Sequence, residues 1–99
     1  MERERLLIIE DDEDIRAQLT YALQDEYDVS VAGDRARAAA AVQQAPPEIV
    51  TLDLGLPPSP DTAEEGLRAL EDILGVTPDA KVIIITGNGD RANAMPCPR

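Results

Sequence analysis

The stretch that opens at Arg5 reads RLLIIEDDED and closes at Asp14. Its aliphatic half, residues 6–9, is short and uninterrupted, as in a strand that is buried on both faces of a sheet. Its acidic half begins at Glu10, so we expect the strand to emerge at the sheet edge there and a helix to follow, because acids stabilise the first turn of a helix. This pattern is typical of the first βα unit of a parallel sheet.

The same change from strand to helix recurs along the chain. Alternating strands and helices of 10–15 residues predict βαβ units, a parallel sheet and right-handed crossovers. We therefore expect one α/β domain built on an open, doubly wound sheet with helices on both faces. The further strands are predicted over residues 28–32, 48–53 and 81–86, and the helices from Asp12, from Asp34 to about Gln44, and from a capping box at Thr62–Glu65.

The composition excludes several classes of function. The 99 residues carry 9 Lys and Arg, 20 Asp and Glu and no His, a net charge of −11. So acidic a chain is unsuited to binding nucleic acid or an anionic membrane, and without His it has no imidazole for nucleophilic catalysis. Cys97 is the single cysteine, which excludes an internal disulfide, and no apolar run is long enough to be a signal or a span. We expect a soluble, cytoplasmic protein.

Polar side chains stand at three predicted strand ends: Glu10 and Asp11 after the first strand, Asp53 on the third and Thr86 on the fourth. Each has an ordinary explanation as a helix N-terminus, a turn residue or a strand exit. If the first and third strands are neighbours, however, the acids would converge at the carboxyl end of the sheet, where ligands bind to such folds. Converging carboxylates favour a hard cation such as Mg²⁺, and an aspartate beside it suits phosphoryl transfer.

Three stretches resemble the receiver domain of two-component response regulators: LLIIEDD from Leu6, VTLDLGLP from Val50 and VIIITG from Val82. The resemblance implies a flavodoxin-like, three-layer α/β/α fold with strand order 2-1-3-4. It also implies that Asp53 accepts a phosphoryl group from a histidine kinase or phosphotransfer protein. Such a domain is not an enzyme beyond catalysing its own phosphorylation and dephosphorylation. The Mg²⁺ ligands implied are Asp11 directly, Glu10 through water, Asp53 and the Gly55 carbonyl, with Thr86 as the switch hydroxyl. Asp12 falls outside the family's acidic pair, and we interpret it as a helix cap.

A narrower resemblance concerns residues 56–67 and 86–94, which are similar to the receiver of PEP-CTERM-box response regulators. Those regulators join the receiver to a sigma-54-type ATPase and a helix-turn-helix module. The resemblance implies that phosphorylation regulates transcription through an output domain that is not in this chain.

The chain departs from the family pattern at its C-terminal end. Family receivers continue to a fifth strand, which carries an essential lysine, and a fifth helix, whereas no lysine follows Lys81 here. We therefore expect residues 1–99 to form one C-terminally truncated receiver domain, with residues 96–99 as an irregular tail. The fourth strand would then be an open sheet edge, and we expect self-association through it or through the C-terminal segment.

Two other functions stay open from the sequence. The first is a truncated pseudo-receiver that cannot be phosphorylated and acts as a dimerising or protein-binding module. The second is a small Mg²⁺-dependent phosphohydrolase, which is the weakest because Asp53-Leu54-Gly55 lacks a second acid two residues on.

Overall fold

Four aliphatic segments form the strands of one parallel sheet in the computed structural model, which describes residues 3–54 and 64–85. All four predicted strands and all three predicted helices are confirmed, with ends that differ by a residue or two. The residues outside this description are 1–2, 55–63, with Gly55 and the first half of the capping box, and 86–99, with Thr86 and the tail. The elements are β1 (Arg5–Ile9), α1 (Glu13–Leu23), β2 (Asp28–Ala32), α2 (Arg35–Gln44), β3 (Ile49–Asp53), α3 (Glu64–Val76) and β4 (Lys81–Ile85).

The strand order is β2-β1-β3-β4, so β1 and β3 lie in the interior of the sheet. This position explains why both strands are buried along nearly their whole length, because an interior parallel strand is covered on both faces. Residues 6–9 of β1 are all buried, as are residues 50–53 of β3. The order 2-1-3-4 confirms the predicted doubly wound, flavodoxin-like fold.

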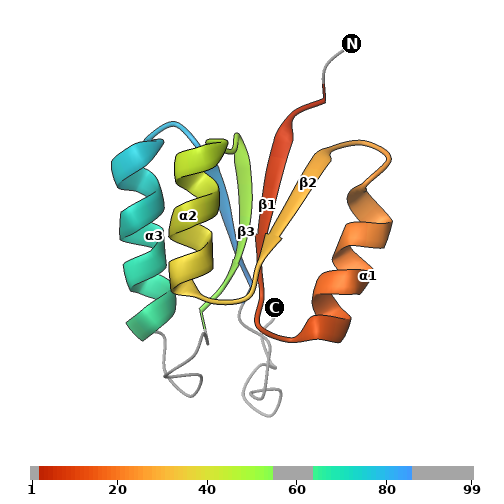
Figure 1. The fold of residues 1–99 in the computed structure, drawn as a ribbon, viewed down its shortest axis with the longest axis horizontal. Helices are drawn as coiled ribbons and strands as arrows, with labels where there is room; N and C mark the ends of the chain where they lie inside the picture. Colours follow the sequence, from red (N-terminus) through yellow and green to blue (C-terminus); the bar gives the residue numbers. More distant parts are fainter. Residues whose placement is uncertain (1–2, 55–63, 86–99) are drawn as a thin grey trace, which may run out of the picture.

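Helices cover both faces of the sheet (Figure 1), which confirms the three-layer arrangement. Helices α2 and α3 pack against each other and against one face, and α1 lies on the opposite face over β1 and β2. The hydrophobic core lies mainly under α2 and α3, where aliphatic residues of three strands meet the two helices. Its buried members are Leu7, Ile9, Ala32, Ala38, Val42, Val50, Leu52, Ala69 and Ile73.

Two aspartates cap helices as the sequence predicts. The Asp12 carboxylate accepts hydrogen bonds from the backbone N–H groups of Asp14, at 2.9 Å, and Ile15, at 3.2 Å. The Asp34 carboxylate accepts one from the backbone N–H of Arg37 at 2.8 Å. These bonds satisfy donors that have no partner inside the helix.

Helix α1 is only partly buried. No residue of its apolar stripe is fully buried, and Ile15 is 37% exposed. Within the described residues α1 lies alone on its face of the sheet, so no second helix encloses the stripe. None of the helices described has the length and apolar character needed to cross a membrane.

Candidate metal and phosphoacceptor site

The strand register brings the predicted site residues together. Strands β1 and β3 are parallel neighbours with Ile9 opposite Leu52. The residue after each member of this pair is an acid, so Glu10 comes to lie beside Asp53 at the carboxyl end of the sheet. Asp11 follows at the turn into α1. The predicted convergence of these three acids is confirmed.

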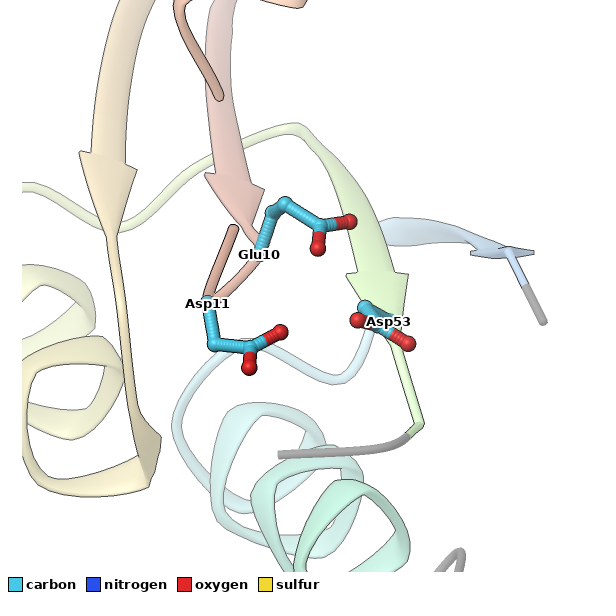
Figure 2. A group of neighbouring side chains, drawn as sticks. All are labelled: Glu10, Asp11 and Asp53. Carbon is cyan, nitrogen blue, oxygen red and sulfur yellow. The ribbon is translucent and has the colours of Figure 1, made fainter. Parts of the chain in front are cut away.

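The three carboxylates border a common space (Figure 2). One oxygen from each of Glu10, Asp11 and Asp53 lies within 4.8 Å of the other two. The Glu10 and Asp53 residues are only 4% and 3% exposed, whereas Asp11 lies closer to solvent. Two of the three acids are therefore held where water screens their charge poorly.

Burial and mutual repulsion raise the pKa values of Glu10 and Asp11. Burial is the largest cause for Glu10, and the neighbouring Asp53 and Asp11 add to it, so that its pKa rises from 4.5 to about 7. A hydrogen bond from the backbone N–H of Asp12, 3.2 Å from Glu10 Oε2, acts in the opposite direction. The pKa of Asp11 is also raised, first by burial and then by the charge of Asp53. A cation in this space would offset the repulsion.

The donor set suits a hard divalent cation. All three side chains offer carboxylate oxygens, and Mg²⁺ binds through one or two carboxylates with water and phosphate oxygens at its other positions. Asp12, next to the cluster, is occupied as the cap of α1. Gly55 and Thr86, the other two predicted site residues, lie outside the described residues.

Arg16 holds the turn between β1 and α1 through the backbone of two of the acids. Its Nη1 donates to the backbone carbonyl oxygen of Glu10 at 3.0 Å and to that of Asp11 at 3.3 Å. On the other side, the backbone N–H of Glu10 donates to the carbonyl of Ala32 at 3.0 Å. Both peptides that carry the acids are thus tied to the rest of the fold.

Gly66 allows α3 to approach the chain directly after Asp53. A Cβ at Gly66 would stand 2.5 Å from the carbonyl oxygen and 2.8 Å from the carbonyl carbon of Leu54. Only a residue without a side chain fits so near a backbone. The first turn of α3 therefore packs against the peptide that follows the proposed phosphoacceptor.

Sequence reasoning missed Arg16 and both glycines that adjoin the site, Gly33 and Gly66. Arg16 has the appearance of an ordinary charged residue on a helix, and Gly33 that of a strand terminator. The one signal for Gly66 is a glycine inside a helix, which usually has a packing reason.

The family model of the response regulator receiver domain matches residues 6–97. The DNA-binding response regulator MtrA of Mycolicibacterium smegmatis is 41% identical over 56 residues, which are 56% of this chain and 25% of MtrA. The chain thus spans about a quarter of the length of this relative.

Solved structures give the same fold. A response regulator receiver domain protein (CheY-like) from Methanospirillum hungatei has a TM-score of 0.77 and 26% identity, over 92% of this chain and 70% of that one. A response regulator protein from Burkholderia pseudomallei, with a phosphorylated aspartic acid, calcium ion and citrate, has a TM-score of 0.75 and 26% identity. That match covers 90% of this chain and 50% of the other.

Proposed function

The chain belongs to the response regulator receiver family, and on that premise we propose that Asp53 accepts a phosphoryl group in a Mg²⁺-dependent reaction. The observation that carries the proposal is the convergence of three carboxylates, two of them buried, at the carboxyl ends of β1 and β3. The donor would be a phosphohistidine of a kinase or phosphotransfer protein, or a small phosphodonor. The related Burkholderia protein, with its phosphorylated aspartic acid and calcium ion, supports this assignment.

In the proposed reaction a carboxylate oxygen of Asp53 attacks the phosphorus atom. The new O–P bond forms as the P–N bond to the donor imidazole breaks, and the ring nitrogen keeps the electron pair. Asp11 and Glu10 would hold Mg²⁺, Asp11 directly and Glu10 through water, and Asp53 itself would complete the carboxylate set. When bound, Mg²⁺ offsets the charge on the phosphoryl oxygens. Beyond the described residues, the Gly55 carbonyl is assigned as a further ligand and the Thr86 hydroxyl as the switch group.

Intact mass spectrometry after incubation with acetyl phosphate and Mg²⁺ tests this function. We expect the wild type to gain the mass of one phosphoryl group and Asp53→Asn to gain none. Asp25→Asn, a matched change in the exposed turn after α1, should be phosphorylated like the wild type. An adduct that survives in Asp53→Asn, or no adduct in the wild type, would contradict the assignment.

The consequence of phosphorylation is proposed to be control of transcription through a DNA-binding output domain. The similarity to MtrA, a DNA-binding response regulator, supports this role. The net charge of −11 argues that the receiver segment itself does not contact DNA.

The exposed edge of the sheet favours an additional function in self-association. Strand β4 is the last strand in the order of the described sheet. Ile83 is 54% exposed and Ile84 44% exposed, although both belong to an apolar strand. Such an edge is a ready surface for pairing with a second chain. Light scattering across a concentration series should reveal dimers that Ile83→Lys abolishes, and a wild type that stays monomeric at high concentration would exclude this pairing.

A further inference from the structure

Arg16 donates to backbone carbonyls although it lies beside a run of acids. Four acids, residues 11–14, come shortly before it in the sequence. Yet within residues 3–54 and 64–85 its guanidinium forms no ion pair, whereas Arg35, Arg37 and Arg68 each do. Arg3 and Arg5 also donate to backbone carbonyls, but each to one carbonyl far from the acids. Nη1 of Arg16 instead donates to two successive backbone carbonyls, those of Glu10 and Asp11. Those two peptides carry two of the three acids of the proposed metal site.

A gap at Gly33 provides the space for this arrangement. Gly33 follows β2, whose last residue, Ala32, pairs with Ile9 and accepts the N–H of Glu10. A Cβ at Gly33 would lie 2.9 Å from Arg16 Nη1, which is closer than real Cβ contacts come. A side chain at residue 33 would therefore displace the guanidinium from its observed position against the two carbonyls.

The contact acts on the positions of the acids and not on their charges. A positive charge near the site would by itself repel Mg²⁺, so charge alone predicts tighter metal binding when Arg16 is removed. Fixing the backbone has the opposite effect, because two ligands held in register bind a cation better than two that must be ordered. The two roles therefore predict changes of opposite sign in Mg²⁺ affinity.

We propose that Arg16 is a positioning residue of the metal site, which acts by holding the Glu10 and Asp11 carbonyls, and that Gly33 is the space that lets it do so. This inference rests on the proposed function, since it assumes that Glu10 and Asp11 hold Mg²⁺. It assigns to the first turns of α1 and to the end of β2 a part in setting Mg²⁺ affinity.

Calorimetric titration of the whole chain with Mg²⁺ alone tests the proposal. For Arg16→Gln we expect the dissociation constant to rise about tenfold, the lower end of what loss of a group that orients metal ligands produces. Gly33→Ala should also weaken Mg²⁺ binding, because the new Cβ displaces the Arg16 guanidinium from the two carbonyls. This variant keeps the arginine charge, and the long Arg16 side chain can move without disturbing the fold. Arg37→Gln removes the same charge from an arginine that is 78% exposed and should leave the affinity unchanged. Gly75→Ala, with nothing within 4 Å, is the matched control for Gly33→Ala.

A phosphorylation assay separates positioning from a general loss of structure. The Mg²⁺ concentration for half-maximal rate should rise in Arg16→Gln and Gly33→Ala, while the rate at saturating Mg²⁺ stays near that of the wild type. Unchanged or tighter Mg²⁺ binding in Arg16→Gln would overturn the positioning role and leave the proposed function intact. A wild type that binds no Mg²⁺ would overturn both the positioning role and the proposed function. If Asp11→Asn bound Mg²⁺ as tightly as the wild type does, the ligand assignment on which the inference rests would be wrong.

Discussion

Replacing Gly66 with alanine is expected to destabilise the fold where α3 meets the chain after Asp53. The new Cβ would lie 2.5 Å from the Leu54 carbonyl oxygen and nearer still to the Leu54 Cα. These are backbone atoms, so no rotamer change relieves the overlap and either α3 or the end of β3 must move. Overpacking of this kind costs about 3 kcal/mol, and the better helix propensity of alanine returns at most about 1 kcal/mol. The net loss is about 2 kcal/mol.

Gly75→Ala is the matched control because it lies in the same helix and its Cβ would meet nothing within 4 Å. There the change should stabilise by about 0.5–1 kcal/mol, through helix propensity alone. The two variants should therefore differ by about 3 kcal/mol.

Urea unfolding followed by circular dichroism measures this difference, read as a change of midpoint at constant slope. In a thermal scan, each kcal/mol corresponds to about 4–8 °C for a chain of this size. A Gly66→Ala protein as stable as Gly75→Ala would refute the close approach. Because the strained peptide adjoins Asp53, Gly66→Ala should also be phosphorylated more slowly at saturating Mg²⁺, whereas Gly75→Ala should not.

Three further predictions concern pH, a helix cap and an ion pair. The folded-state pKa of Glu10, about 7, lies above its ordinary value of 4.5, so its contribution to stability is complete below pH 4.5 and is lost as the pH rises through 7. Without divalent cations, the unfolding free energy of the wild type relative to Glu10→Gln should fall by roughly 3 kcal/mol between pH 4.5 and 8 in urea titrations. A constant difference would contradict the raised pKa. Asp34→Ala should lower the unfolding free energy by about 1 kcal/mol, with Asp34→Asn nearer the wild type, and equal losses in the two variants would contradict the cap. Arg35→Met removes a 2.8 Å ion pair to Asp72 between α2 and α3. Because both side chains are about one-third exposed, the unfolding free energy should fall by at most about 1 kcal/mol, and by less at high salt. A larger loss that does not depend on salt would contradict a surface ion pair.

The elements of this fold could be predicted because the signals for them are local. A run such as Leu6 to Ile9 reports burial on both faces, and a cap such as Asp34 reports the start of its helix within four residues. Strand order is not local in this sense. The neighbourhood of β1 and β3, which creates the site, followed from the resemblance to receiver domains and is confirmed by the register of Ile9 with Leu52. The narrower likeness to PEP-CTERM-box regulators stays a prediction.

The contacts around the site could not be predicted because they join residues distant in sequence. Gly66 lies next to Leu54 and Gly33 next to Arg16 only after the helices have packed on the sheet. In the sequence a glycine marks a turn or a flexible point, and nothing local tells which glycine is required by a neighbouring backbone. The incomplete cover of α1 has the same origin, since amphipathic spacing predicts which side of a helix is apolar but not how much of it is enclosed.

The acids at the strand ends oppose folding, and this helps to distinguish a functional site from a structural cluster. A sheet end selected for stability alone would carry apolar or amide groups where Glu10 and Asp53 are buried, because burial and mutual repulsion raise the pKa of Glu10 toward 7. Glu10→Gln should therefore make the metal-free protein more stable at pH 8 and at the same time weaken its binding of Mg²⁺. A cluster that only supports the fold would lose stability on the same change. A variant that gains stability and loses Mg²⁺ affinity therefore identifies a functional site, in which buried charges lower stability but are needed to bind the cation.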